Sequence, residues 1–167
     1  AGTPPLEALR VLLSEAATVD DDDDDDGDKV IETGDVSRAF FEACATRDVC
    51  LELPDEALTE EEKLLDLVGH LRMSLYGTRD AAQNWANAYT EFMLKAGFEK
   101  GSASPCAFWH PARKIRCGVH GDDFTTVGPK CELDKFETEL ESKYELKKGG
   151  RLGPGDEDAK EITVRRN

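Results

Sequence analysis

The chain has 167 residues, of which 39% are hydrophobic and 34% are charged, and its formal net charge is −15 at pH 7. This length suits one domain with a hydrophobic core, and no apolar run is long enough to span a membrane, so we expect a globular protein without a membrane partner. The acidic charge argues against a nucleic-acid-binding protein, which would need a basic surface to meet phosphate groups.

The cysteines and the start of the chain lead to expectations about the cellular compartment and about the extent of the protein. The five cysteines are odd in number and show no zinc-ligand spacing. They predict reduced thiols in an intracellular protein that is not secreted, in the cytoplasm or the nucleus. The sequence begins without a basic signal segment and without Met, so we expect a piece of a longer protein.

The first predicted elements are a helix over residues 3–17 and an acidic loop over residues 20–26. Leucines recur at helical spacing in the first segment. The aspartates of the second repel one another, which favours an exposed loop. A calcium-binding loop is the alternative, since Asp22, Asp24 and Asp26 fit half of the EF-hand pattern. However, Thr33 stands where that loop needs glutamate.

The middle of the chain alternates between strand and helix patterns. The expected elements are a strand over residues 29–34, a helical segment over 36–46, a strand over 49–53 and a helix over 80–96. Asp35 follows the first of these strands directly. Gly97 follows the last helix in the position where glycine usually ends one.

The last third of the chain predicts a hairpin and one more helix. The expected elements are strands over residues 107–109, 115–119 and 124–127, a helix over 133–144 and a short β-prone run at 161–164. His120-Gly121-Asp122-Asp123 forms the bend of the hairpin, and Gly128-Pro129 is expected to break its second strand. The order predicts an α+β fold, an antiparallel sheet with helices packed on one face.

Two acidic motifs carry the candidate chemistry. Asp35 lies at a strand end, and Asp122 and Asp123 lie at the hairpin bend. Transfer of a nucleotide to a 3′-hydroxyl uses two divalent cations, and such hard cations prefer carboxylate oxygens. Carboxylates on adjacent strands could hold such a pair. The same residues are also common in turns and helix caps, so both interpretations stay open at this point.

A series of short motifs resembles the reverse transcriptases of copia-type retrotransposons, over nearly the whole chain. The motifs are Asp35-Val36-Ser37-Arg38-Ala39-Phe40, Val49-Cys50-Leu51-Glu52-Leu53-Pro54, Ser74-Leu75-Tyr76-Gly77, Trp85, Gly97-Phe98, Ser104-Pro105-Cys106-Ala107-Phe108 and Gly121-Asp122-Asp123. Each motif is short, but their order and spacing are similar to those of the family. The helix over residues 3–17 also looks like the one that precedes the family's palm.

The resemblance implies a role for each site residue. Asp35 and Asp122 would bridge two Mg²⁺ ions, with Mn²⁺ as a substitute, and Asp123 would be a weaker catalytic neighbour. The carbonyl of Val36 would add a metal ligand. Phe40 would lie beneath the sugar and reject a 2′-hydroxyl, and a packing role is its alternative. The Gly77 region would line the template and the incoming base.

The resemblance also implies domains and partners. Residues 1–146 would form a palm with partial fingers, with residues 18–28 as an acidic insertion. Residues 147–167 would begin a truncated thumb or connection. The partners would be an RNA or DNA template with its primer, deoxynucleoside triphosphates, and a parent polyprotein with integrase and RNase H. Two departures are His120-Gly121, where relatives have Tyr-Val, and Asp80, where the family has Gln.

Three hypotheses follow for the function. The first is a fragment of an RNA-directed DNA polymerase, and the second is a decayed or domesticated palm that binds partners without catalysis. The third is an RNA-dependent RNA polymerase, which shares Gly-Asp-Asp. Phe40 argues against the third, because RNA synthesis must admit a 2′-hydroxyl. The acidic charge and the expected lack of complete fingers and thumb predict little polymerase activity from the isolated chain.

Overall fold

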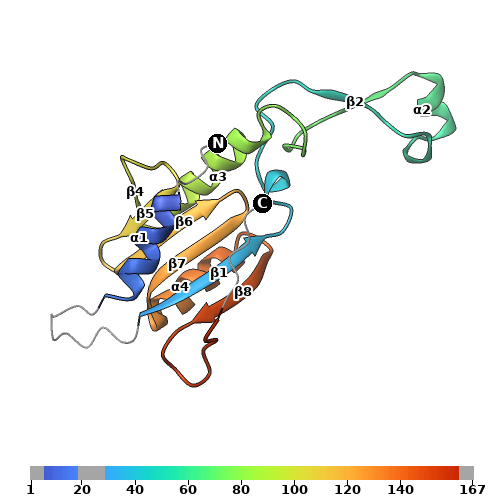
Figure 1. Ribbon diagram of the computed structural model, residues 1–167. Helices are drawn as coiled ribbons and strands as arrows, with labels where there is room; N and C mark the ends of the chain where they lie inside the picture. Colours follow the sequence, from blue (N-terminus) through green and yellow to red (C-terminus); the bar gives the residue numbers. More distant parts are fainter. Residues whose placement is uncertain (1–5, 19–28, 162–167) are drawn as a thin grey trace. The chain divides into compact units, whose positions relative to one another are not determined.

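The computed structural model describes residues 6–18 and 29–161, which divide into two compact units (Figure 1). Unit 1 comprises the chain up to Arg38 and from Tyr89 onward, and unit 2 comprises Ala39–Ala88. The expected division at residues 146 and 147 therefore does not coincide with a boundary between units. The acidic run at residues 20–26, with its calcium-loop alternative, lies outside the described residues.

Unit 1 is built on a six-stranded sheet with antiparallel pairing between all neighbours. Its strands, in spatial order, are β4 (Glu99–Lys100), β5 (Ala107–His110), β6 (Ile115–His120), β7 (Asp123–Pro129), β1 (Lys29–Val36) and β8 (Leu146–Leu152). The predicted hairpin is confirmed as β6 and β7. However, β7 continues through Gly128 and Pro129, where a break was expected, because both residues still pair with the start of β1.

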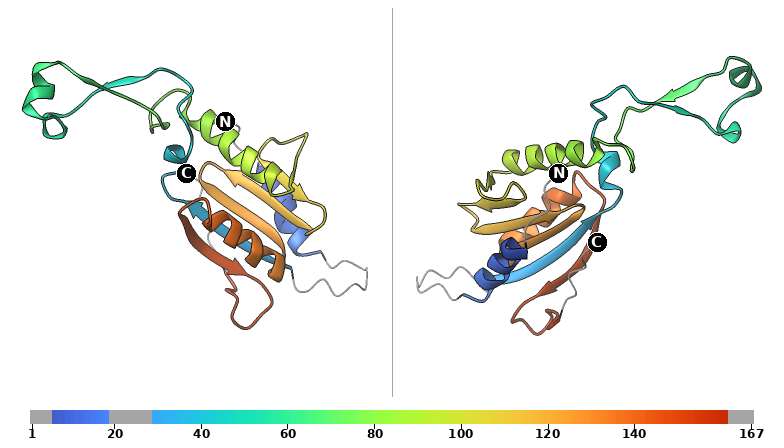
Figure 2. Two further views of the ribbon diagram at one scale, coloured as in Figure 1. Left: turned by 180° about the vertical axis from the view of Figure 1, so that it is seen from behind. Right: turned by 45° about the horizontal axis from the view of Figure 1, so that its top comes forward.

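The helices of unit 1 cover both faces of the sheet (Figure 2), so the expectation that all helices share one face is wrong. On one face, Leu12 of α1 (Leu6–Ala16) packs against Ile31 and Val127. On the other, α4 (Lys130–Glu141) presents Phe136 and Leu140, which are buried. Adjacent residues of a strand point to opposite faces, and consecutive buried residues such as those at 124–129 require cover on both.

The end of α3 (Ala81–Lys95) agrees with the sequence prediction. Gly97 has a φ of +93°, the left-handed conformation that glycine adopts readily. The Phe98 N–H donates to the Met93 carbonyl at 3.0 Å, and the Gly97 N–H donates to the Leu94 carbonyl at 3.1 Å. These two hydrogen bonds form a Schellman motif, which stops the helix and turns the chain into β4.

Strand β8 was not predicted, since its Lys- and Gly-rich sequence looked like the start of another segment. It pairs with β1 as an edge strand, and the register shifts between Thr33 and Gly34. A side chain at Gly149 would collide with Thr33 at this irregularity, so glycine is required here for packing. The β-prone run at residues 161–164 lies almost wholly outside the described residues.

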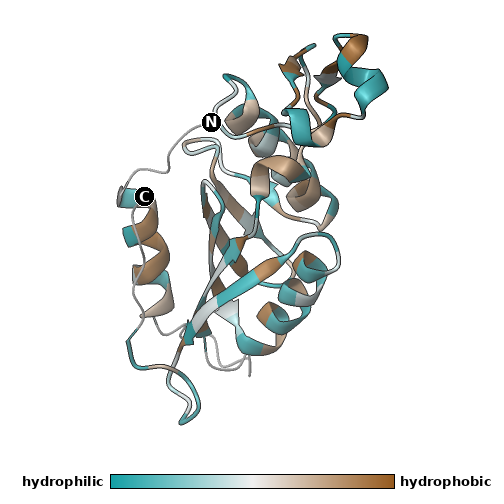
Figure 3. Cartoon of the chain, turned by 90° about the vertical axis from the view of Figure 1, so that its right-hand side faces the viewer, coloured by the Kyte–Doolittle hydropathy of each residue, from teal (hydrophilic) through white to brown (hydrophobic). Residues whose placement is uncertain are grey.

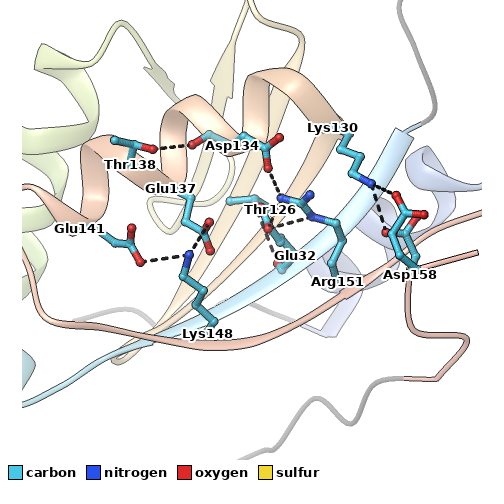
Figure 4. A network of polar contacts seen from close by, with 11 residues as sticks. Glu32, Thr126, Lys130, Asp134, Glu137, Thr138, Glu141, Lys148, Arg151 and Asp158 are labelled. Carbon is cyan, nitrogen blue, oxygen red and sulfur yellow. Dashed lines mark hydrogen bonds and ion pairs between the residues drawn. The ribbon is translucent and has the colours of Figure 1, made fainter. Parts of the chain in front are cut away.

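A network of ion pairs joins β1 and β8 to α4 and to the turn after β8 (Figure 4). Arg151 bonds to Glu32 and Asp134, and Lys148 bonds to Glu137 and Glu141. Lys130 bonds to Glu157 and Asp158 in the same region. These ion pairs hold the edge strand β8 in place, because the sequence of β8 has little apolar surface to bury.

Unit 2 consists of short elements and the first turns of α3. These elements are η1 (Ala39–Glu42), β2 (Cys50–Glu52), η2 (Asp55–Ala57), α2 (Glu60–Leu64) and β3 (Val68–His70). Strands β2 and β3 pair antiparallel, in line with the strand predicted at residues 49–53. The helical segment expected over residues 36–46 is reduced to η1, because β1 extends to Val36 before it and Cys44 forms a β-bridge with Met73 after it.

No residue between β2 and β3 is buried, so this segment has no core of its own. Acidic residues and exposed aliphatic residues both occur along it and its two flanking strands (Figure 3). The exposed aliphatic residues are Leu51, Leu53, Leu64, Leu65, Leu67 and Val68. Local hydrogen bonds hold it instead, and Thr59 and Glu62 form a complete capping box at the start of α2.

Candidate metal centre

Four residues of unit 1 form one row across four adjacent strands. In spatial order they are Lys147 of β8, Asp35 of β1, Asp123 of β7 and His120 of β6. Each is the direct cross-strand partner of the next, so their side chains project from the same face of the sheet. The row therefore has two carboxylates in its centre and a basic residue at each end.

Asp122 joins this row from the hairpin bend. The loop of two residues, Gly121 and Asp122, connects the paired residues His120 and Asp123. Gly121 has a φ of +64°, and a side chain there would meet open space, so the conformation and not crowding requires glycine. The Val36 N–H donates to the Asp122 carbonyl at 2.9 Å, which ties the bend to the end of β1.

The three aspartates meet closely enough to share a metal ion. One carboxylate oxygen from each of Asp35, Asp122 and Asp123 lies within 4.8 Å of the others, and all three residues are partly exposed. No other group of three or more potential His, Cys, Asp or Glu ligands occurs among residues 6–18 and 29–161. The structure thus brings together the acids that two distant motifs supplied.

Burial and the neighbouring negative charges both raise the pKa values of Asp35 and Asp123. Burial, followed by the negative charge of Asp122, raises the pKa of Asp35, and Lys147 opposes this rise. Burial, followed by the charges of Asp122 and Asp35, raises the pKa of Asp123, and His120 opposes this rise. A divalent cation among the oxygens would relieve the repulsion, and hard carboxylate ligands suit Mg²⁺ or Mn²⁺.

The other predicted site residues lie in different surroundings. Val36 is fully buried as the last residue of β1, one peptide bond after Asp35. Phe40 and Gly77 belong to unit 2. The Phe40 ring contacts Tyr76 at a centroid distance of 4.3 Å, and Gly77 has a φ of +92°. Gly77 therefore needs to be glycine for conformational reasons alone.

Sequence reasoning gave no role to two basic residues, Lys147, which lies beside Asp35 in the sheet, and Arg38, which follows Asp35 by three residues in the chain. Lys147 is one end of the row, and only the pairing of β8 with β1 places it beside Asp35. Arg38 forms an ion pair of 2.7 Å with Glu145, and its φ of 55° is unusual for a residue other than glycine. The sequence carried no signal for Lys147, because a Lys-Lys-Gly-Gly segment does not predict a strand.

Asp80 has a clear structural role in unit 2. Its carboxylate accepts hydrogen bonds from the Thr46 hydroxyl and the Asn84 side-chain amide, both at 3.1 Å. Asn84 also donates to the Ser74 hydroxyl at 3.1 Å. The Asp that departs from the family's pattern therefore connects the start of α3 to the loops before it.

One comparison with known proteins identifies a relative. Over 153 residues the chain is 26% identical to the "Retrovirus-related Pol polyprotein from transposon TNT 1-94" of Nicotiana tabacum. The match covers 89% of the chain and 10% of that polyprotein, so the chain spans about a tenth of the length of the relative. No protein-family model matches the chain, and no solved structure matches it. The similarity supports an origin in a transposon polyprotein.

A helix must be both long and apolar to cross a membrane. None in the described part of the chain combines the length and the apolar character needed to cross a bilayer.

Proposed function

We propose that this chain is the reverse transcriptase part of a retrotransposon Pol polyprotein, an RNA-directed DNA polymerase of the two-metal type. The observation that carries the proposal is the convergence of Asp35, Asp122 and Asp123 from two strands and a tight bend. The similarity to a retrovirus-related Pol polyprotein from a transposon supports it.

The protein's contribution to this reaction would be rigid placement of oxygen ligands. Asp35 and Asp122 would hold both ions, Asp123 would stand beside them, and the Val36 carbonyl would complete the ligand set. The ladder between β1 and β7 pairs residues 29–35 with 123–129 without interruption, which keeps the two ends in register. Two bound Mg²⁺ ions would activate the primer 3′-hydroxyl and neutralise charge on the triphosphate.

Phe40 and Gly77 would take part in substrate selection, as the family resemblance implies. Phe40 would exclude a 2′-hydroxyl by steric contact, which favours deoxynucleoside triphosphates. Its ring packs against Tyr76, and the Phe41 ring also lies 5.7 Å from Tyr76. Gly77 would leave room for the template and the incoming base, since nothing lies within 4 Å of its missing side chain. The partners would be a primed template and a deoxynucleoside triphosphate.

One observation favours a second candidate, a palm without catalytic activity. The net charge of −15 opposes template binding, which depends mainly on neutralising phosphate groups. A polymerase that cannot retain its primer and template cannot position them for reaction, even with its metal ions bound. We therefore expect metal binding from the isolated chain, and little or no primer extension.

Metal binding tests the proposal without depending on polymerase activity. Isothermal titration with Mn²⁺ and Mg²⁺ should detect binding in the wild type, and Asp122→Asn should weaken it at least about tenfold, as loss of a charged ligand does. Glu137→Gln is a matched control, because Glu137 pairs with Lys148 on the opposite face of the sheet. Equal binding by wild type and Asp122→Asn would refute the two-metal proposal.

Primer extension on an RNA template at low salt separates the two candidates. Extension with Mg²⁺ or Mn²⁺ that disappears in Asp122→Asn would show a working polymerase and contradict the expected inactivity of the isolated chain. Metal binding without extension, even when basic fusion partners hold the template, would favour the non-catalytic palm.

A further inference from the structure

Residues 50–70 of unit 2 expose a cluster of aliphatic side chains, which we call the aliphatic patch (Figure 3). The patch consists of Leu64, Leu65, Leu67 and Val68, whose exposed fractions are 87%, 68%, 44% and 55%. Single exposed aliphatic side chains need no explanation, whereas a cluster of them marks a surface that another molecule covers. The aliphatic patch is therefore a candidate interaction surface.

Local hydrogen bonds give the aliphatic patch a defined shape. The capping box of Thr59 and Glu62 begins α2. The Leu65 N–H donates to the Glu62 carbonyl at 3.2 Å. Asp66, between the two aliphatic pairs, has a φ of 51°, which is uncommon for a residue other than glycine. A partner would bind a surface that is already ordered, which lowers the entropic cost of association.

The charge around the aliphatic patch is strongly negative. Residues 50–70 contain seven acidic side chains and a single Lys or Arg, which is Lys63. Lys63 pairs with Glu60 at 2.9 Å, and Glu62 takes part in the capping box. The other acids are exposed, and within the described part of the chain none of them forms an ion pair: Glu52, Asp55, Glu56, Glu61 and Asp66.

Charge complementarity decides between the possible occupants of this surface. Nucleic acids and anionic membranes are negatively charged, so these acids would repel them. A second copy of the chain would bring the same acids and a net charge of −15. A partner with positive charge and an apolar face would instead match both features of residues 50–70.

We propose that residues 50–70 form a docking site for a basic amphipathic segment of a partner protein. The apolar face of that segment covers the aliphatic patch, and its Lys and Arg side chains pair with the five exposed acids around the patch. Neither the patch nor these acids belong to the three-aspartate site, so the docking site is independent of the proposed polymerase reaction.

Isothermal titration of the full chain with synthetic peptides tests this docking site. The probe is an amphipathic peptide of lysine and leucine. One matched peptide has glutamate in place of lysine, and another has serine in place of leucine. We expect only the lysine–leucine peptide to bind, because binding needs both opposite charge and apolar contact. Its affinity should fall as the salt concentration rises.

Substitutions in the chain separate the two contributions. Leu64→Ser combined with Leu65→Ser should weaken binding of the lysine–leucine peptide at least about tenfold, because burial of both leucines is lost. Glu61→Gln combined with Asp66→Asn should weaken it about two- to fivefold and reduce its salt dependence. All four side chains are exposed, so the midpoint of urea unfolding should stay unchanged in both variants.

The matched control changes the same residue types in unit 1. Leu94 is 51% exposed on α3, and Glu99 is exposed on β4. Leu94→Ser combined with Glu99→Gln removes one exposed leucine and one exposed acid, and it should leave the affinity for the lysine–leucine peptide unchanged. A loss as large as that in Leu64→Ser/Leu65→Ser would show general attraction to an acidic protein and overturn the docking site.

Other results would also overturn the proposal. The wild type could fail to bind the lysine–leucine peptide, or bind the lysine–serine peptide equally well. A single-stranded RNA oligonucleotide that binds the wild type and loses affinity in Leu64→Ser/Leu65→Ser would make this surface a nucleic-acid contact. Self-association in sedimentation velocity that disappears in the same variant would make a second copy of the chain the occupant.

Discussion

Replacing Arg151 with methionine should destabilise unit 1 more than any other single change in its ion-pair network. The Arg151 Nε donates to the Glu32 carboxylate at 3.0 Å, and the same guanidinium group contacts Asp134 (Figure 4). The side chains of Arg151 and Glu32 are only 20% and 14% exposed. The substitution would leave the largely buried Glu32 carboxylate of β1 without its cation.

The expected loss is about 2–3 kcal/mol in the free energy of unfolding. Removing one partner of a fully buried ion pair costs about 3–5 kcal/mol. The loss in the free energy of unfolding caused by Arg151→Met should be smaller, because a fifth of the Arg151 side chain reaches solvent and Asp134 is more than half exposed. For a chain of this size, such a loss lowers the unfolding temperature by roughly 4–12 °C.

The loss should also depend on pH. Burial raises the pKa of Glu32, and the hydrogen bond and charge of Arg151 oppose that rise. A carboxyl with a raised pKa in the folded state contributes stability below its unfolded pKa, and this contribution is lost as pH rises through the folded pKa. Without Arg151 the pKa of Glu32 rises further, so the deficit of Arg151→Met should be largest at neutral pH and shrink on acidification.

Urea unfolding followed by circular dichroism, at about pH 7.5 and about pH 5.5, would measure both quantities. Lys148→Met is the matched control, because its lysine is 57% exposed, and it should cost at most about 1 kcal/mol. Equal losses in the two variants, or a deficit of Arg151→Met that does not change with pH, would refute the reasoning.

Three further predictions concern one face of the sheet and unit 2. Leu12→Ala should cost about 2–3 kcal/mol in urea unfolding, because it removes the contact of α1 with the sheet, and an unchanged midpoint would show that α1 does not stabilise unit 1. With EDTA present, Asp35→Asn should lose less stability than the wild type as the pH rises from about 4 to about 7, since the raised pKa of Asp35 makes its ionised form unfavourable in the folded state. Parallel pH profiles of the two proteins would contradict this. In a polymerase-competent parent protein, Phe40→Ala should increase ribonucleotide incorporation, and equal incorporation by both enzymes would leave Phe40 with its packing contact to Tyr76 alone.

Local patterns in the sequence predicted the elements that local chemistry specifies. The apolar stripe and Gly97 predicted α3 and its end, because a left-handed residue after a helix is nearly always glycine. Alternating β-prone residues around His120-Gly121-Asp122-Asp123 predicted the hairpin for a similar reason, since a loop of two residues needs a residue with positive φ.

Long-range pairing decided the features that the sequence did not reveal. The residues of β8 were expected to begin a thumb or connection segment, because lysine and glycine disfavour strands, yet β8 binds the free edge of β1 through backbone hydrogen bonds that any residue can make. The same limitation hid the placement of α1, whose apolar stripe fits either face of a sheet.

The candidate site likewise combines features that the sequence predicted with features that only long-range pairing determined. The sequence identified Asp35, Asp122 and Asp123 as acids at strand ends, because a carboxylate beside a turn is visible in one dimension. The register of β1 with β7 then determined that Asp35 and Asp123 share one row next to the bend that carries Asp122, and the register of β1 with β8 placed Lys147 beside Asp35. A shift of one residue in the pairing of β1 with β7 or β8 would send Asp35 to the opposite face, and only the packed cores on both sides of the sheet exclude that shift.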